Sequence, residues 1–192
     1  MDKAKIIKFI TGNNNKALEV EQIIKNILPN IKVEAVKVDD IPELQGEPEE
    51  IAKEKLKHVR KFIKDGIIMV EDTSLCFNSY KGLPGPYIKD FLNKIGLDGL
   101  TKMASALGDN TAYAQCIFAL SENVTDEPKL FIGRTSGKIV DRRGPNSFGW
   151  DPIFEPDEGN NRTYSELPKE EKNKISHRYK SLNALADYYK SI

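Results

Sequence analysis

The chain has 192 residues, 39% hydrophobic and 30% charged, which is typical of one globular domain, with or without two lobes, and excludes a disordered or fibrous protein. Lysine plus arginine and aspartate plus glutamate each number 29, so no net charge would attract nucleic acid or an anionic membrane. No apolar run reaches the roughly 18 residues of a membrane span or resembles a signal peptide, and the only cysteines, Cys76 and Cys116, suit a reducing cytosol.

The first elements predicted are a strand, a polar turn and a helix. Residues 6–10 predict the strand, and apolar residues at helical spacing between Leu18 and Leu28 predict the helix, which ends before Pro29. Small polar residues form the turn Thr11-Gly12-Asn13-Asn14-Asn15-Lys16. Its N–H groups and the helix N-terminus suit an anion, with Lys16 adding a full charge; a plain connection capped by an asparagine is the alternative.

A half-exposed strand over residues 31–38, an acidic loop over residues 39–47 and a second helix follow. Pro48 suits the first turn of this helix, and its apolar stripe runs toward Gly66. Three lysines, Lys53, Lys55 and Lys57, are most simply its solvent-facing side.

Ile67-Ile68-Met69-Val70 predicts a short buried strand that is followed directly by Glu71-Asp72. Because an unpaired buried charge is costly, we expect the strand to end at Val70 and to hold both carboxylates at the rim of a sheet. Ligands bind at that rim in open α/β sheets. The alternative is that the acids only mark the exit of a strand.

The middle of the chain predicts two helices and a hairpin. The breakers of Gly82-Leu83-Pro84-Gly85-Pro86 predict a rigid turn, and Gly96 separates short helices over residues 87–95 and 97–107. Strands over residues 111–121 and 129–140, the second interrupted near Gly133 and Gly137, predict an antiparallel hairpin and therefore a mixed sheet.

The last part of the chain combines an aromatic loop with a basic helix. Residues 142–152 contain the only tryptophan, which either lines a ligand pocket or plugs the core. A second loop follows through Gly159 and Thr163. Residues 168–192 predict helix, with Ser176 as a possible N-cap of the final part and with an apolar face made of Leu182, Leu185, Ala186 and Tyr189. Cations gather near the helix start, where they oppose the helix dipole. They indicate either a bound polyanion or solvated charge; they are Lys169, Lys172, Lys174, His177 and Arg178.

The chain offers one set of side chains suited to phosphate oxygens and one set of carboxylates suited to a hard divalent cation. The first set is Asn13, Lys16, Lys172, His177 and Arg178, and the second is Glu43, Glu71 and Asp72. Mg²⁺ prefers one or two carboxylates together with phosphate oxygens and water, so the combination points to hydrolysis of a nucleoside triphosphate. The sequence has no G-x-x-x-x-G-K-[ST] loop, no G-x-G-x-x-G fingerprint and no catalytic triad, and its two histidines argue against a His-rich zinc site.

Over nearly its whole length the chain resembles the inosine triphosphate pyrophosphatase family, eukaryotic branch. The resemblance is carried by Thr11 to Lys16, Glu43 with Leu44-Gln45-Gly46-Glu47-Pro48, Glu71-Asp72-Thr73, Gly82-Leu83-Pro84-Gly85-Pro86-Tyr87-Ile88-Lys89, Phe148-Gly149-Trp150-Asp151-Pro152 and Ser176-His177-Arg178. Bacterial members carry two aspartates and a serine in place of Glu71-Asp72-Thr73, and tyrosine in place of Trp150. Some relatives have a second lysine in place of Asn15.

The resemblance implies hydrolysis of ITP, dITP and XTP to the monophosphate and pyrophosphate by a cytoplasmic homodimer that acts on a small molecule and needs neither nucleic acid nor membrane. It implies a single α/β domain over residues 1–192, with a long mixed sheet flanked by helices and two lobes with the active site in the cleft between them. Glu43 and Asp72 would hold Mg²⁺, or Mn²⁺ in its place, and Asp72 or Glu71 would activate water. The substrate-binding positions would be Thr11, Gly12, Asn13, Asn14, Asn15, Lys16, Lys55, Asp72, Thr73, Lys89, Phe148, Gly149, Trp150, Asp151, Lys172, His177 and Arg178.

Two other functions are consistent with parts of this pattern. A Maf-like pyrophosphatase would share the fold and act on other nucleotides, but the motifs of residues 148–151 and 176–178 argue against it. A nucleotide-sensing module without catalysis would keep the cations and lose Glu43 or Asp72, both of which are present.

Overall fold

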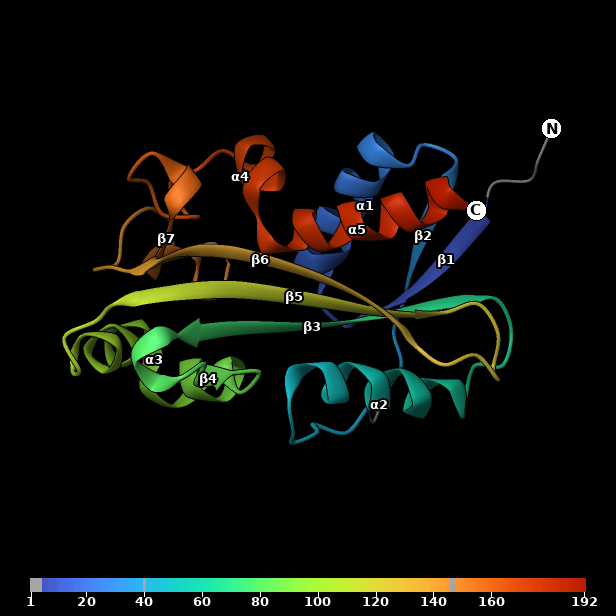
Figure 1. Cartoon of the computed structure of the whole chain (residues 1–192), viewed down its shortest axis with the longest axis horizontal. Coiled ribbons are helices and arrows are strands. Elements are labelled where there is room, and N and C mark those ends of the chain that lie inside the picture. The colour runs from blue at the N-terminus through green and yellow to red at the C-terminus, as the bar shows by residue number, and fades with distance from the viewer. Residues whose placement is uncertain (1–4, 40, 146–147) are drawn as a thin grey trace. The chain divides into compact units, whose positions relative to one another are not determined.

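The computed structural model describes residues 5–39, 41–145 and 148–192 (Figure 1). Asp40 of the predicted acidic loop, and Asn146 and Ser147 of the predicted aromatic loop, lie outside these residues. The described strands are β1 (Lys5–Ile10), β2 (Ile31–Val36), β3 (Ile67–Phe77), β4 (Pro84–Gly85), β5 (Thr111–Ser121), β6 (Lys129–Ile139) and β7 (Phe154–Pro156). The described α-helices are α1 (Asn14–Ile27), α2 (Pro48–Arg60), α3 (Ile88–Ser105), α4 (Lys169–Ile175) and α5 (His177–Ser191).

The strands form one mixed sheet in the order β2-β1-β3-β5-β6-β7, with β4 paired to β3. β1 is parallel to β2 and β3, whereas the β3–β4 and β6–β7 pairs are antiparallel, so the predicted mixed sheet is confirmed. The chain divides into two compact units. The first unit holds the residues up to Asp72, Ile117–Gly133 and Ser181–Ile192, and the second unit holds Thr73–Cys116 and Arg134–Lys180.

In the first unit, α1 and α5 lie on one face of the strands and α2 lies on the other (Figure 1). The α2 face is sealed by Leu56 and Val59, which pack on Val70 and Ile117 of the strands. Of the predicted apolar face of α5, Leu182, Leu185 and Ala186 are fully buried and Tyr189 is partly buried. Among the described residues, no helix is long and apolar enough to cross a membrane.

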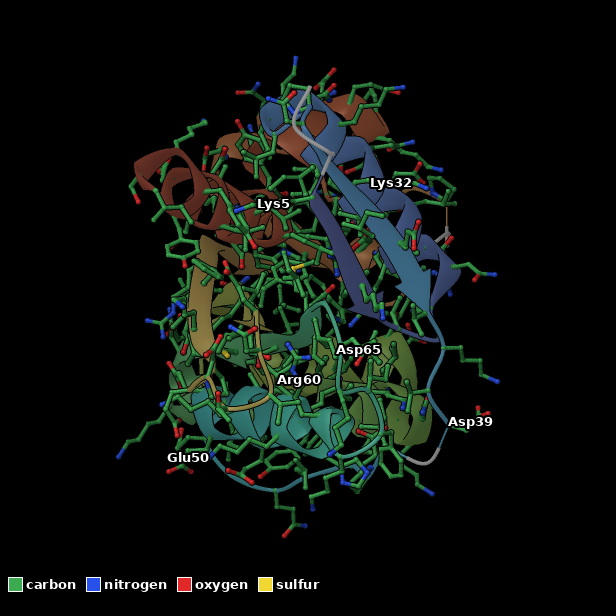
Figure 2. The ribbon with its side chains drawn as sticks, turned by 90° about the vertical axis from the view of Figure 1, so that its right-hand side faces the viewer. Lys5, Lys32, Asp39, Glu50, Arg60 and Asp65 are labelled. Carbon is green, nitrogen blue, oxygen red and sulfur yellow. The ribbon has the colours of Figure 1, made fainter. Side chains whose placement is uncertain are left out.

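A buried arginine fastens the C-terminal end of α2 to β5. Arg60, labelled in Figure 2, is 6% exposed and donates through Nε to Ser121 Oγ at 2.7 Å and through Nη2 to Ser121 O at 2.6 Å. The helix ends there, so the prediction that it runs toward Gly66 is wrong by about one and a half turns. The exposed side chains of Lys32 and Asp39 point away from this core (Figure 2).

The prediction that the central strand ends at Val70 is wrong, because β3 continues to Phe77. Glu71 is only 3% exposed, and its burial is tolerated because Lys16 forms an ion pair with it. The neighbouring strand β1 does stop at this level, since its last residue, Ile10, is in register with Val70. Glu71 and Asp72 therefore follow the carboxyl end of β1 rather than that of β3.

The second unit has its own core. It includes Leu100 of α3, Phe77 of β3, Ala114 of β5 and Trp150 with Phe154. Gly96 interrupts α3 with φ +66°, so the predicted break between two helical segments is confirmed. Ser176 separates α4 from α5, and its Oγ accepts from Tyr179 N at 3.1 Å, which confirms the predicted N-cap.

β6 is not interrupted at its glycines, contrary to the prediction, and side chains on one of its faces are buried in alternation. The short strand β7, which was expected to be loop, pairs with β6 in the register Gly137 to Pro156. A Cβ on Gly137 would overlap Glu155 O and would lie 2.9 Å from Phe154 Cζ. The glycine thus allows β7 to approach closely.

Replacing Gly137 with alanine should lower the free energy of unfolding by about 1–3 kcal/mol, because β7 must move away from the added methyl group. Ser136→Ala, at an exposed neighbouring position, is the matched control and should stay within about 0.5 kcal/mol of the parent. Urea unfolding of both variants measures the difference. Equal midpoints for Gly137→Ala and the parent would show that β7 adapts to the methyl group without cost.

Candidate active site

The polar turn after β1 is fixed by its own side chains. Asn13 Oδ1 accepts from Asn15 N at 3.0 Å and from Lys16 N at 3.1 Å, and Asn13 N donates to Thr11 Oγ1 at 3.1 Å. The asparagine cap that the sequence offered as an alternative is therefore present. It does not exclude an anion, because Gly12 and Asn14 also contribute N–H groups beside the N-terminus of α1.

Two lysines from different helices converge on Glu71. Lys16 Nζ lies 3.3 Å from Glu71 Oε1, and Lys55 Nζ donates to Glu71 O at 2.8 Å. Lys55 is partly buried, so assigning it to the solvent-facing side of α2 is wrong, whereas Lys53 and Lys57 are exposed as predicted. Burial and the nearby Lys16 lower the pKa of Lys55.

Asp72 follows Glu71 and lies in a largely desolvated position. Its Oδ2 is buried and has no hydrogen-bond partner within the described part of the chain. Burial raises the pKa of Asp72 to about 6, against the opposing effect of Lys55 and Lys16 and with a further increase from Glu71 and Glu43. The carboxyl group therefore changes charge near neutral pH, as a general base requires.

The carboxylates around Asp72 also fit a magnesium ion. Glu43 lies on the exposed loop before α2, close enough to raise the pKa of Asp72. Within residues 5–39, 41–145 and 148–192, no three His, Cys, Asp or Glu side chains could hold a metal ion by themselves. Mg²⁺ needs no such cage when phosphate oxygens and water complete its shell, and Asp72 Oδ2 is an oxygen left available for it.

The second unit contains a buried ion pair beside an aromatic ring. Lys172 Nζ lies 2.6 Å from Asp151 Oδ2, and the two side chains are 5% and 8% exposed. The same ammonium group lies 4.8 Å from the centre of the Phe148 ring, and the Arg178 guanidinium lies 5.9 Å from it. Solvated charge is thus the wrong explanation for Lys172, His177 and Arg178, which are buried, although Lys169 and Lys174 are exposed.

The two large aromatics of the loop have different environments. Trp150 is 8% exposed, and the centre of its ring lies 5.5 Å from that of His177 and 6.2 Å from that of Tyr164. Of the two alternatives predicted for Trp150, packing into the core is therefore the correct one. Phe148 is partly exposed and borders a pocket of about 450 Å³ that is also lined by Leu92 and Gly96 of α3 and by Arg142. This volume is within the usual range for small-molecule sites.

The structure thus gathers the predicted residues into two sets, one in each unit. The first-unit set is Thr11, Gly12, Asn13, Asn14, Asn15, Lys16, Glu43, Lys55, Glu71 and Asp72, and the second-unit set is Phe148, Gly149, Trp150, Asp151, Lys172, His177 and Arg178. Thr73 follows Asp72 on β3, and Lys89 is exposed in the first turn of α3. Sequence reasoning missed Tyr164, whose hydroxyl lies 3.4 Å from His177 Nδ1, because no local pattern marks it.

Comparison with known proteins identifies the family. The profile of the Ham1 family matches residues 7–188. The chain belongs to the Ham1 family. A relative from Emericella nidulans named inosine triphosphate pyrophosphatase is 51% identical over 184 residues, which cover 96% of each chain.

Solved bacterial Ham1 structures share the fold. A HAM1 protein from Coxiella burnetii has a TM-score of 0.81 at 26% identity and covers 98% of this chain and 100% of its own. The Ham1 protein of Staphylococcus aureus has a TM-score of 0.73 at 26% identity, covering 97% and 99% of the two chains. A nucleoside-triphosphatase, dITP/XTP pyrophosphatase, from Mycobacterium abscessus has a TM-score of 0.69 at 28% identity and covers 94% of this chain and 98% of its own. The higher identity to the fungal relative agrees with the predicted eukaryotic branch.

Proposed function

We propose that this Ham1-family chain hydrolyses deaminated purine nucleoside triphosphates (ITP, dITP and XTP) to the nucleoside monophosphate and pyrophosphate, and so clears them from the nucleotide pool. The observation that carries the proposal is the convergence of Lys16 and Lys55 on the Glu71–Asp72 pair beside the N-terminus of α1. The names of the fungal relative and of the Mycobacterium abscessus structure support the choice of ITP, dITP and XTP.

The phosphate chemistry follows from the charges of the first unit. Lys16, Lys55 and the N–H groups at the start of α1 attract the triphosphate and offset the negative charge that develops on the leaving pyrophosphate. Asp72, with its raised pKa, accepts a proton from the water that attacks the α-phosphorus. Mg²⁺ would be held by Glu43 and by Asp72 through water, because direct coordination would depress the pKa that the base needs, and it would supply further charge neutralisation at the phosphates when bound.

The second unit supports recognition of a purine that carries an oxygen at position 6. Such a base has a donor at N1–H and an acceptor at O6, whereas adenine presents the reverse pattern. Beside the Phe148 ring, Asp151 offers an acceptor, and Lys172 and Arg178 offer donors. A base of the reverse pattern would oppose acceptor to acceptor and donor to donor, which disfavours it.

The physiological setting is part of the same proposal. The sequence has only two cysteines and both are buried, which supports a cytoplasmic location. The resemblance to inosine triphosphate pyrophosphatases supports a homodimer and the requirement for Mg²⁺.

The proposal is tested by incubating the protein with ITP and Mg²⁺ and separating the products. We expect IMP and pyrophosphate in equal amounts, much slower turnover of ATP, and loss of turnover when EDTA removes the metal. IDP with phosphate would contradict the proposal. Binding of ITP without turnover would favour the nucleotide-sensing module instead.

A further inference from the structure

Arg143 closes the loop that carries Phe148 and Trp150. Its N–H donates to Pro152 O at 2.9 Å, on the far side of that loop. Inside this closure, Asp151 N donates to Phe148 O at 3.0 Å. These bonds hold Arg143 beside Pro152 and Phe148 beside Asp151, so the positions of Phe148 and Trp150 depend on them.

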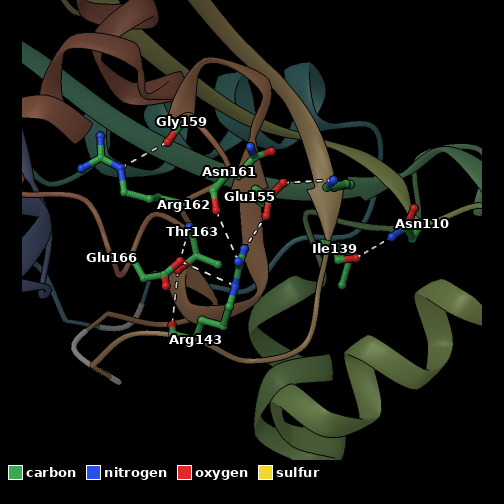
Figure 3. A network of polar contacts seen from close by, with 10 residues as sticks. Asn110, Ile139, Arg143, Glu155, Gly159, Asn161, Arg162, Thr163 and Glu166 are labelled. Carbon is green, nitrogen blue, oxygen red and sulfur yellow. Dashed lines mark hydrogen bonds and ion pairs between the residues drawn. The ribbon is translucent and has the colours of Figure 1, made fainter.

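The side chain of Arg143 reaches three further segments of the second unit (Figure 3). Its Nη2 donates to Glu155 Oε2, its Nη1 donates to Asn161 O at 3.3 Å, and its Nε lies 3.6 Å from Glu166 Oε2. Its carbonyl oxygen accepts from Thr163 Oγ1 at 3.3 Å. A planar guanidinium can make such a divergent set of contacts, whereas a lysine ammonium offers only a point charge.

Residues 163–166 form hydrogen bonds with both ends of the loop, at Pro145 and at Asp151. Ser165 Oγ donates to Pro145 O, and Ser165 N donates to Asp151 O at 3.3 Å. Glu166 Oε2 accepts from Thr163 N at 2.8 Å, which fixes the carboxylate that faces Arg143. This strap, residues 163–166, thus connects Arg143 to the segment that presents Asp151.

Glu155 has two cationic partners, and only one of them belongs to the loop. It is 7% exposed and pairs with Arg143 and with Lys138, whose Nζ lies 3.0 Å from Oε1. Burial alone would raise the pKa of Glu155, but hydrogen bonds from Lys138 and Arg143 outweigh it and lower the pKa overall. Lys138 lies on β6, outside the loop, and therefore provides a matched control for the charge of Glu155.

We propose that Arg143 is a positioning residue for base recognition, holding the loop so that the Phe148 ring and the Asp151 carboxylate face the purine. This inference rests on the proposed function, because it takes the purine as the ligand of these two side chains. Arg143 acts through the loop and touches neither the phosphates nor the attacking water.

Three variants test the proposal: Arg143→Gln, Arg143→Lys and the control Lys138→Gln. Arg143→Gln should raise KM for ITP about tenfold or more and leave kcat within about twofold, because base positioning is lost while the phosphate chemistry is kept. Arg143→Lys should recover part of the loss, since it keeps the charge facing Glu155. Lys138→Gln should leave KM unchanged.

Trp150 provides a second readout that does not depend on activity. It is the only tryptophan and is 8% exposed, so its fluorescence reports the loop closure directly. Arg143→Gln should shift its emission to longer wavelength and increase quenching by acrylamide at temperatures where the protein remains folded. Lys138→Gln should change neither property.

Each outcome decides one point. Equal effects of Arg143→Gln and Lys138→Gln would overturn the proposal, since the charge of Glu155 alone would then explain them. An unchanged KM and unchanged Trp150 emission in folded Arg143→Gln would also overturn it. If the parent protein does not hydrolyse ITP, the proposed function fails, and the emission of Trp150 alone decides whether Arg143 holds the loop.

Discussion

Replacing Asp72 with asparagine should lower kcat by at least about a hundredfold. Asparagine keeps the shape of the side chain but cannot accept the proton of the attacking water at neutral pH. Steady-state kinetics with ITP and Mg²⁺ measure the loss. Turnover within tenfold of the parent would show that another group, with Glu71 the nearest candidate, activates the water.

The same variant should be more stable than the parent at neutral pH. Because the folded-state pKa of Asp72 is about 6 and its ordinary value is 3.8, the folded protein retains a proton that the unfolded chain releases. The contribution of Asp72 to the free energy of unfolding is therefore fully present below pH 3.8 and is lost as the pH rises through about 6. Asp72→Asn avoids this loss and should raise the free energy of unfolding at pH 7.5 by about 3 kcal/mol.

Urea unfolding of the parent and Asp72→Asn at pH 4 and pH 7.5, in EDTA, measures this difference. The gain should be nearly absent at pH 4. Glu71→Gln is the matched control, and it should not stabilise the protein at either pH, because Glu71 already has Lys16 as its ion-pair partner. A gain for Asp72→Asn that is equal at both pH values would contradict the role of its charge.

Replacing Lys172 with methionine should lower the free energy of unfolding by about 3–5 kcal/mol, because Asp151 is left as a buried charge without its cation. The double variant Lys172→Met with Asp151→Asn should recover most of this loss, since neither charge then remains. Both variants should also bind ITP weakly. Lys174→Met, at an exposed position on α4, is the control and should be nearly neutral.

Thermal or urea unfolding of the four proteins completes the comparison. A cost below about 1 kcal/mol for Lys172→Met would mean that water reaches Asp151 when the lysine is removed. A double variant as unstable as Lys172→Met would mean that methionine itself disturbs the packing against Phe148.

Local patterns in the sequence predicted much of the fold. The strand over residues 111–121, the break at Gly96 and the cap at Ser176 depend on neighbours in sequence, and all three were predicted. The continuation of β3 could not be predicted in this way. It depends on Lys16, a residue far away in sequence that makes the burial of Glu71 acceptable.

In the candidate site, too, local sequence predicted some features, whereas others depend on residues far apart in sequence. Motifs indicated the residues of both sets, but the desolvation of Asp72 and the inward position of Lys55 depend on strands and helices meeting in the folded chain. The contacts of Arg143 with Glu155, Asn161 and Glu166 likewise come from β7 and the turns after it, where the sequence indicated only loop.

The order of residues within the first unit has a consequence for biosynthesis. That unit draws its last portion from Ser181–Ile192, where Leu182 and Leu185 are fully buried and Ser181 Oγ donates to Phe131 O at 2.6 Å. Synthesis proceeds from the N-terminus, so both segments of the second unit are made before Ser181–Ile192, and the first unit cannot finish folding until they have been made. A nonsense codon after Lys180 would therefore leave a polypeptide that retains Lys16, Lys55 and Asp72 but lacks part of the core that positions them.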